Sequence, residues 1–465
     1  MITTEIKLFD TKSRELQPLV ISNDKKLRVY SCGPTVYRDA HVGNMRTFLL
    51  GDLVTRLAKF VGYEVEFIQN ITDVGHMSED FVEDKMLAQA KAESKDPFEI
   101  ARIYEKRFHE DLRRLNIEPA NSYPKASECI NLMQELIQKL IDSDHAYLGT
   151  DNCVYFSAQS FPGYGAISGN RLDALKPGHR FEYTEDGAKR FHADWALWKA
   201  AGDRTEMIWD SPWGKGFPGW HIECSAMSLH YLDKFVDLHL GGIDLRFPHH
   251  ENERAQSNAA INKEAVALWI HGEHLLFESR KMSKSSGNVV LVADLIDKHL
   301  DPLSLRVCFL ENRYRSQMDL SWESLKAAHI LIQRWREKII IWQQDMQSDS
   351  NQVKNLVDEI VLDFSQDLDT PRAIQKLRVI EKDDSISNGV KYEVFKAVDP
   401  LFGLDLFKSV LKAELPDDLA QLLAARQVAR DSKNFNESDR LRDLLAQKGI
   451  EVKDNKAGQE WDWRL

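Results

Sequence analysis

The sequence predicts an α/β fold built on a parallel sheet and followed by a helical region. Three observations lead to this prediction: a strand, a glycine turn, a helix and a strand follow one another near the N-terminus, amphipathic helical patterns begin at Trp322, and the chain has 465 residues. A chain of this length is too long for one compact core, so about two to four domains are expected.

The N-terminal unit begins with an alternating apolar and polar segment at 27–31, which is typical of a strand. A glycine–proline turn follows, and apolar residues then recur at helical spacing as far as Val61. Gly62 ends that helix, and 64–68 has the pattern of the next strand. Such a unit builds a parallel sheet, whose ligands gather at the carboxyl ends of the strands.

His41, Gly43 and Asn44 stand at the start of the predicted helix. A glycine there lets a phosphate or an aromatic base approach the backbone, and the N-terminus of a helix favours anions. His41 adds a side-chain donor for phosphate oxygens. Histidines at helix starts are usually structural, so this pattern alone is weak evidence for a phosphate site.

A second phosphate-binding pattern lies far downstream, at 281–288. Lys281 and Lys284 alternate there with small hydroxyl residues ahead of a glycine, a composition typical of a loop. An ammonium group on a flexible stem can follow negative charge as it moves between phosphates during a reaction. A solvated surface loop is the alternative, and the companion pattern at 41–44 favours the nucleotide site.

Two cysteines and a histidine–carboxylate pair indicate a candidate metal site. Cys32 follows the first strand, Cys224 lies far away in the sequence, and His249 and Glu253 stand four residues apart, on one face of a helix. The next histidine, His250, pairs at that spacing with an arginine, which cannot bind a metal. Thiolate, imidazole and carboxylate are ordinary zinc ligands. Buried cysteines and core histidines are the alternative, since nothing in the sequence alone brings the two thiols together.

The two phosphate patterns resemble the signatures of class I aminoacyl-tRNA synthetases, a His-Ile-Gly-His type sequence and Lys-Met-Ser-Lys-Ser. The segment at 281–285 keeps the second signature, whereas 41–44 departs from the first at Val42 and Asn44. The resemblance implies a Rossmann-type catalytic domain that condenses an amino acid with ATP and passes the product to tRNA. It implies ATP contacts, with Mg²⁺ accompanying ATP, from His41, Gly43, Asn44, Lys281 and Lys284, of which His41 and the two lysines would act in catalysis.

Within that class the chain resembles the cysteinyl-tRNA synthetases nearly from end to end, through the segments 32–37, 219–227 and 247–253. The resemblance implies one zinc ion held by Cys32, Cys224, His249 and Glu253, and it places Thr72 and Trp220 near the amino and carboxylate ends of L-cysteine. A core role for Trp220 is the alternative. Zinc binds a thiol as the thiolate, which a hydroxyl or a methyl group cannot match, so no editing site is needed.

The resemblance also implies an order of domains. We expect the catalytic domain at 1–118 and 209–275, a connective insertion at 119–208, a stem-contact region with the lysine loop at 276–325, a helical bundle at 326–405, and a small mixed α/β anticodon-binding domain at 406–465. The positions implied to contact the anticodon are Arg430, Phe435, Asp439 and Arg442. Phe435 stands where the family usually has tryptophan, and either ring can stack on a base. A solvated helix face is the alternative.

Composition narrows the remaining possibilities. The mean hydropathy is −0.43 and no long apolar run occurs, so we expect no membrane association. Five cysteines form no CxxC pair, which fits a reducing compartment, and we expect a cytoplasmic monomer. A net charge of −12 argues against indiscriminate binding of nucleic acid, although local basic patches can still bind tRNA.

The expected function is ligation of L-cysteine to tRNA(Cys), with ATP converted to cysteinyl adenylate and pyrophosphate before the amino acid reaches the 3′ end of the tRNA. Two alternatives stay open: a ligase that joins cysteine to an amino-sugar inositol, and a catalytically inactive RNA-binding paralogue. The long helical tail disfavours the first. His41, Lys284 and the complete metal set disfavour the second.

Overall fold

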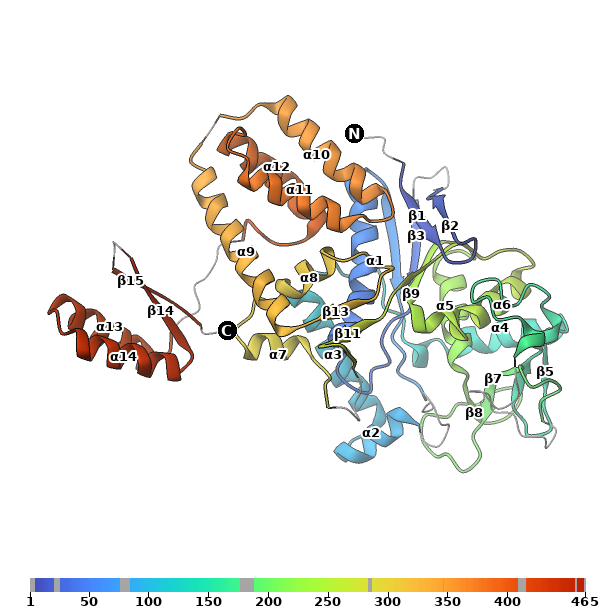
Figure 1. The fold of residues 1–465 in the computed structure, drawn as a ribbon. Coiled ribbons are helices and arrows are strands. Elements are labelled where there is room, and N and C mark those ends of the chain that lie inside the picture. Colours follow the sequence, from blue (N-terminus) through green and yellow to red (C-terminus); the bar gives the residue numbers. More distant parts are fainter. Residues whose placement is uncertain are drawn as a thin grey trace.

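The structure is a computed structural model that describes residues 5–20, 26–75, 84–175, 188–282, 287–345, 347–408, 415–455 and 458–463. Among these residues, a parallel sheet of four strands lies at the centre of the N-terminal two thirds of the chain (Figure 1). The strands follow one another in the order β10 (Val266–Gly272), β9 (Val236–Gly242), β3 (Lys26–Ser31) and β4 (Glu64–Gln69). The predicted parallel pairing of the first two strands of the sequence, β3 and β4, is confirmed.

Both faces of this sheet are covered, since residues of its strands join two different apolar cores. Every residue of β9 is buried. Along β3, Leu27 and Val29 join the core that contains α1, whereas Tyr30 joins the core of α5 on the opposite face. This alternation follows from the two-residue period of a strand.

Helix α1 (Val42–Phe60) connects β3 to β4 and begins with a reciprocal cap. The backbone N–H of Asn44 donates to His41 Nδ1 at 3.3 Å, and the backbone N–H of His41 donates to Asn44 Oδ1 at 3.1 Å. Beyond the helix Gly62 has a φ of 97°, a conformation that glycine adopts without strain. The sequence therefore predicted both ends of this helix correctly.

A second, antiparallel sheet is formed by the part of the chain between β4 and β9. Its strands are β5 (Ala146–Leu148), β6 (Val154–Phe156), β7 (Trp195–Ala200) and β8 (Gly216–Pro218), in that order. Strand β8 lies beyond residue 208, where the sequence placed the end of the insertion. Helix α4 (Ile130–Asp142) shares a core with this sheet and with α5 (Trp220–Tyr231), and α6 (His249–Ile261) packs on α5.

The rest of the described N-terminal region consists of a hairpin and two helices. These are the hairpin β1 (Lys7–Asp10) and β2 (Glu15–Pro18), with α2 (Lys85–Glu93) and α3 (Pro97–Arg114) after β4. A small sheet then follows β10, in the order β12 (Arg280–Lys281), β11 (Leu275–Phe277) and β13 (Met318–Leu320). Strands β11 and β12 form the hairpin that leads into the lysine segment at 281–288.

The helical bundle contains α9 (Trp322–Trp342), α10 (Ser350–Ser365), α11 (Thr370–Lys382) and α12 (Asn388–Phe402). It is joined to the small sheet through α7 (Val292–Asp297) and α8 (Leu303–Leu310). Ser321 caps α9, where the hydroxyl accepts from the backbone N–H of Ser324 at 3.1 Å. The bundle shares one continuous apolar core with α1, so it packs directly on the parallel-sheet domain.

The C-terminal elements form a separate unit (Figure 1). They are α13 (Asp417–Asp431), α14 (Phe435–Gln447) and the antiparallel strands β14 (Ile450–Asn455) and β15 (Gly458–Trp463). The unit has its own small core, and the predicted mixed α/β character is confirmed. Within the described ranges, none of the helices combines the length and the apolar composition needed to cross a bilayer.

Candidate active site

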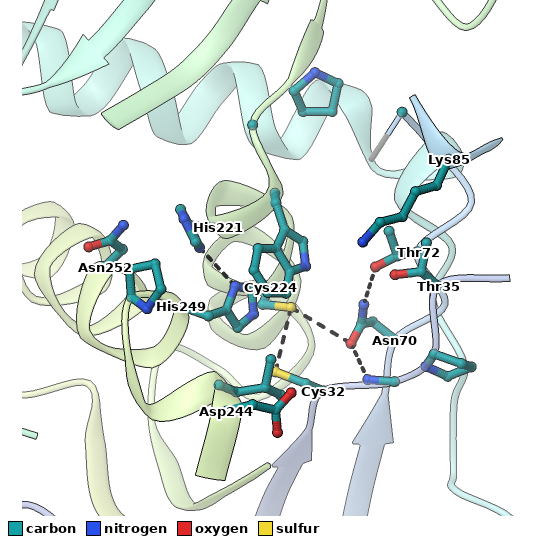
Figure 2. A pocket seen from close by; sticks show the side chains of 18 of the residues that line it. Cys32, Thr35, Asn70, Thr72, Lys85, His221, Cys224, Asp244, His249 and Asn252 are labelled. Carbon is teal, nitrogen blue, oxygen red and sulfur yellow. Dashed lines mark hydrogen bonds between the residues drawn. The ribbon is translucent and has the colours of Figure 1, made fainter. Parts of the chain in front are cut away.

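A cavity of about 490 Å³ opens at the carboxyl ends of β3, β4 and β9 (Figure 2). Cys32, Asn70 and Gly242 line it from the ends of these three strands, and Trp220 and Asn252 line it from the helices α5 and α6. This is the edge at which an open α/β sheet binds its ligands. The cavity therefore lies where the strand and turn pattern of the sequence predicted a binding site.

The four predicted metal ligands meet on one side of this cavity. One ligand atom from each of Cys32, Cys224, His249 and Glu253 lies within 4.8 Å of the others, and all four residues are buried. The two sulfur atoms are 3.9 Å apart, and His249 Nε2 lies 2.9 Å from Glu253 Oε1. The fold thus brings together two thiols that stand far apart in the sequence.

The charges of these groups favour a bound cation. Burial alone raises the pKa of the Cys224 thiol, but its contacts with Cys32 and His249 bring that pKa down to about 6. Burial also opposes ionisation of Glu253, and the neighbouring His239 and His249 hold the pKa of its carboxyl well below the usual range. In the described part of the chain, the ion pairs of Glu253 all involve histidines.

The donor set fits zinc. Two sulfur atoms, an imidazole and a carboxylate are ligands that zinc accepts in tetrahedral sites, and their burial excludes water from most of the surroundings. Anionic groups buried without lysine or arginine partners are costly unless a metal or a proton compensates them. Without a metal the imidazole supplies that proton, because Glu253 and Cys224 outweigh the effect of burial and raise the pKa of His249 to about 10; a zinc ion would replace the proton.

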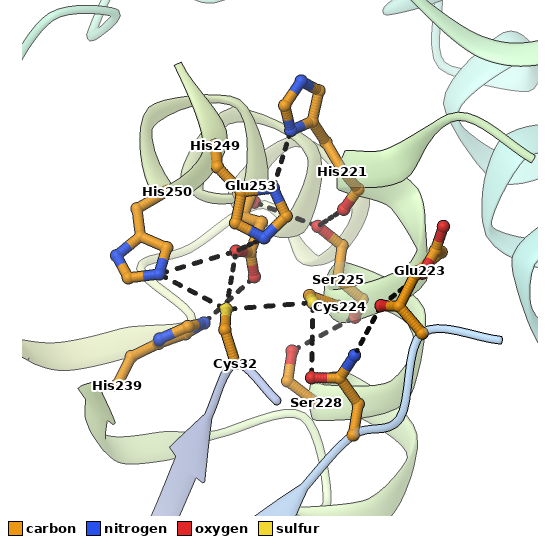
Figure 3. A network of polar contacts seen from close by, with 12 residues as sticks. Cys32, His221, Glu223, Cys224, Ser225, Ser228, His239, His249, His250 and Glu253 are labelled. Atoms are coloured by element: carbon orange, nitrogen blue, oxygen red, sulfur yellow. Dashed lines mark hydrogen bonds and ion pairs between the residues drawn. The ribbon is translucent and has the colours of Figure 1, made fainter. Parts of the chain in front are cut away.

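A second group of potential metal ligands shares two members with the first (Figure 3). It combines Cys32 and Glu253 with His239 and His250. His250 Nε2 lies 3.4 Å from Cys32 Sγ, and His239 Nε2 lies 3.0 Å from Glu253 Oε2. The sequence argument set His250 aside because its helical neighbour is Arg254, but in the structure the ring turns toward the thiol, which makes His250 a second candidate ligand. The i,i+3 spacing of His250 and Glu253 was the signal available for it.

Thr72 and Trp220, the two residues predicted to contact the amino acid, both line the cavity. The Thr72 hydroxyl donates to Glu223 Oε2 at 3.0 Å and accepts from Asn70 Nδ2 at 3.2 Å. The Trp220 ring stacks on the ring of His249, with centroids 4.1 Å apart. Trp220 therefore forms part of the cavity wall rather than of the core. Sequence reasoning missed the buried Glu223, although it lies in the segment 219–227 beside Cys224.

His41 is an uncharged group at neutral pH. Burial, with a contribution from Arg38, lowers the pKa of His41 to about 4. Since the Asn44 N–H donates to Nδ1, the ring proton resides on Nε2, which is left as a donor. Asn44 itself lines the cavity, and its side-chain oxygen accepts from the His41 backbone N–H in the helix cap.

The lysine segment reaches the start of α1. Met282 is buried, and a Cβ placed on Gly43 would lie 3.0 Å from Met282 Cε and 3.0 Å from the His41 ring. On the far side of the segment, the Val290 carbonyl accepts from the Val42 N–H at 2.9 Å. Lys281 is exposed at the end of β12, and the second predicted lysine, Lys284, lies outside the described residues.

Four cationic side chains also line the cavity, and the sequence analysis did not single them out. They are Arg38, Lys85, Lys189 and Lys199. Two come from the segments that flank the N-terminal part of the sheet, and two come from the insertion with its antiparallel strands. Three carboxylates, those of Asp39, Asp194 and Asp244, line the cavity as well, so its lining carries both signs of charge.

The predicted anticodon residues lie in the C-terminal unit. Phe435, Asp439 and Arg442 share α14 at helical spacing, and the ring of Phe435 is 64% exposed. Arg442 pairs with Asp439 on this helix. Arg430, near the end of α13, instead pairs with Asp454 of β14. An exposed ring beside charged side chains is available for stacking, while Arg430 is already engaged within the unit.

Comparison with known proteins extends these observations. A family model for the tRNA synthetases class I (C) catalytic domain matches residues 18–330, and one for the cysteinyl-tRNA ligase anticodon binding domain matches residues 412–461. Similar proteins include the cysteine–tRNA ligases of Treponema denticola (35% identical, covering 98% of this chain and 99% of that one), Thermus thermophilus (38%, covering 98% of each) and Chlamydia muridarum (36%, covering 98% and 99%).

Solved structures agree in fold. A methionyl-tRNA synthetase of Mycobacterium tuberculosis bound by methionyl-adenylate matches with a TM-score of 0.55 and 13% identity, covering 81% of this chain and 92% of that one. At this identity the match supports the fold alone. The sequence matches extend over nearly the whole chain and include both a catalytic and an anticodon-binding domain, and on these grounds the chain belongs to the cysteine–tRNA ligase family of class I tRNA synthetases.

Proposed function

We propose that this chain activates L-cysteine with ATP and transfers it to the 3′ end of tRNA(Cys). One observation carries the proposal: a buried Cys, Cys, His and Glu set and the phosphate-binding start of α1 line or adjoin the same cavity. The first feature selects a thiol and the second binds a nucleotide. The family to which the chain belongs supports the same reaction.

The amino acid binds beside Cys32, Cys224, His249 and Glu253, which would hold one zinc ion. Bound there, zinc would bind the sulfur of cysteine as a thiolate, which gives more discrimination against serine or alanine than a shaped pocket can. Trp220 supports this site by holding the His249 ring from one side. Thr72, fixed by Glu223 and Asn70, offers a hydroxyl near the other end of the amino acid.

The nucleotide binds across the start of α1. The His41 Nε2–H donates to a phosphate oxygen, and the neutral ring does so without repelling nearby lysines. The cysteine carboxylate attacks the α-phosphate of ATP, and pyrophosphate leaves. Lys281 and Lys284 stabilise the charge that develops on the leaving phosphates, and Mg²⁺ accompanies ATP. The reaction needs no protein nucleophile, since the protein contributes position and charge.

The tRNA contacts both the catalytic region and the C-terminal unit. The terminal hydroxyl of the tRNA attacks the adenylate carbonyl in the cavity, while Phe435, Asp439, Arg442 and Arg430 contact the anticodon. We propose the domain limits given under the sequence analysis, with the insertion extended to Pro218 because β8 pairs with β7. We further propose that the protein acts as a monomer in the cytoplasm; its five free cysteines support the reducing compartment.

Cysteine-dependent exchange of pyrophosphate into ATP, followed by charging of tRNA(Cys), tests this function. We expect both reactions, with serine and alanine giving exchange at least about 1,000-fold more slowly than cysteine. Exchange without charging would point to the amino-sugar ligase. Absence of exchange from a folded protein loaded with zinc would leave only the RNA-binding alternative.

A further inference from the structure

Arg46 is a buried arginine of α1. Within the described part of the chain, the hydrogen bonds of its guanidinium all go to main-chain carbonyl oxygens. Nη1 donates to the carbonyls of Glu273 and His274 at 2.8 and 3.0 Å. Nη2 donates to the carbonyls of Arg313 and Ser316 at 3.0 and 2.7 Å. Burial lowers the pKa of Arg46 to about 10, which leaves the group charged at neutral pH. A planar fork of donors can bridge two carbonyl pairs in this way, and an ammonium group cannot.

These carbonyls belong to the base of the small sheet that carries the lysine segment. Glu273 and His274 form the turn between β10 and β11, and β11 continues into the β11–β12 hairpin that ends at Lys281. Arg313 and Ser316 immediately precede β13, which pairs with β11. One side chain of α1 therefore binds the segments that precede two neighbouring strands of this sheet, β11 and β13.

The other end of this connection is the nucleotide-binding start of α1. Arg46 lies two residues after Asn44, in the same first turns of the helix as the His41 cap. The lysine segment returns to this point through Met282, which packs against Gly43, and through the Val290 carbonyl, which accepts from Val42. The phosphates of one ATP molecule must contact the helix start and the lysines at once. The distance between the two elements is therefore set by whatever fixes the hairpin to α1.

We propose that Arg46 is a positioning residue for adenylate formation, which ties the β11–β12 hairpin to α1 and so sets the separation of the two phosphate-binding elements. This inference rests on the proposed function. Arg46 touches neither substrate, and it acts through the backbone of the hairpin. Displacements of about 1 Å at a reacting centre can cost about 100-fold in rate, which makes such a tie consequential.

Arg46→Lys tests the proposal, because lysine keeps the charge but cannot bridge both carbonyl pairs. Arg56→Lys is the control: Arg56 lies on the same helix, is 7% exposed against 5% for Arg46, and donates to the carbonyls of Pro400 and Asn116 as well as to Asp52 Oδ2 at 2.8 Å. The carbonyl contacts tie α1 to the helical bundle and to the turn after α3, away from the hairpin. A loss that is merely structural should affect both variants alike.

We expect Arg46→Lys to slow pyrophosphate exchange by about 10- to 100-fold and to raise KM for ATP, with KM for cysteine and the zinc content unchanged. Arg56→Lys should keep the exchange rate within about threefold at a temperature where both variants are folded. Amide hydrogen exchange provides a second readout that needs no turnover. Amides of the β11–β12 hairpin should exchange at least about tenfold faster in Arg46→Lys than in Arg56→Lys.

Three results would overturn the inference: unchanged kinetics in Arg46→Lys, equal losses in both variants, or a hairpin whose amides exchange no faster. If the unaltered protein showed no pyrophosphate exchange, the proposed function would fail. The hydrogen-exchange comparison would still decide whether Arg46 holds the hairpin.

Discussion

At the scale of single residues, His249 and His250 differ in which group of potential metal ligands they complete. His249 belongs to the set with both thiols, and His250 belongs to the set with Cys32 and His239. We expect His249→Ala to reduce zinc retention at least about tenfold and His250→Ala to leave one zinc ion bound, since zinc favours the set with two thiolates. Zinc content after dialysis against a chelator measures this, and the thiolate absorption of the cobalt-substituted protein shows how many sulfur ligands remain.

The reverse result would assign the metal to the second set. If only His250→Ala lost the metal and the cobalt spectrum indicated a single thiolate, then Cys224 would not be a ligand. Equal retention in both variants would mean that neither histidine is required. The two variants are well matched, because both rings are buried on the same helix.

Gly43 has a steric role that the sequence analysis did not foresee. A methyl group there would press on the His41 ring and on Met282 Cε, each 3.0 Å away. We therefore expect Gly43→Ala to raise KM for ATP by about tenfold or more, because the His41 ring and the Met282 side chain must move aside, while cysteine binding is preserved. The double variant with Met282→Ala should recover part of the loss. A strictly additive double-mutant cycle would contradict the packing explanation.

At the scale of elements, the end of α12 carries an acid whose environment disfavours its charge. Burial raises the pKa of Asp399 from 3.8 to about 6, and the nearby Asp405 carboxylate adds to this. The folded protein therefore holds this proton more tightly than the unfolded chain does. The resulting stabilisation is complete below about pH 3.8 and is lost as the pH rises through 6.

Asp399→Asn should remove that dependence. Between pH 4 and 6 we expect the unaltered protein to lose stability relative to the variant. Above pH 6 the difference in unfolding free energy should reach about 2 to 3 kcal/mol in favour of the variant. The asparagine oxygen can still accept from the Leu406 N–H, so the loop after α12 should keep its conformation. Urea denaturation at several pH values measures the difference. A difference that does not change with pH would refute the assignment.

At the scale of the whole molecule, a ring stack joins the C-terminal unit to the catalytic part. Trp463 of β15 stacks on His299, with centroids 3.8 Å apart and planes 13° from parallel. His299 follows α7, in the connector that begins with the lysine segment. Trp463 also packs on the small core of the C-terminal unit, so the stack connects that core to the connector.

We expect Trp463→Ala to raise KM for tRNA(Cys) in charging by about three- to tenfold, in line with the loss of an aromatic pair, while pyrophosphate exchange stays unchanged. Solution scattering should show a wider range of orientations of the C-terminal unit. Trp461→Ala is a useful comparison, because both rings pack on the core of the unit and Trp463 also stacks on His299. Equal losses of exchange and of charging would show that the stack supports the active site directly.

The sequence predicted the catalytic fold well because its signals are local. The alternation at 27–31, the helical spacing up to Val61 and the glycine after it specify a strand, a helix and its end without help from distant residues. The spacing of His249 and Glu253 likewise depends only on the helix that contains them. The end of the insertion was less predictable, because β8 belongs to that sheet through pairing with β7 alone.

By itself, then, the sequence determined the order of elements, the two phosphate-binding patterns and the types of metal ligand, because periodicity and side-chain chemistry are properties of short segments. Only the tertiary structure decided that Cys32 meets Cys224, that His250 turns toward the thiol, that Trp220 lines the cavity, and that Arg46 holds the base of the lysine hairpin. Each of these depends on the packing of segments distant in the chain, and no local pattern encodes the direction in which a side chain points once two such segments meet.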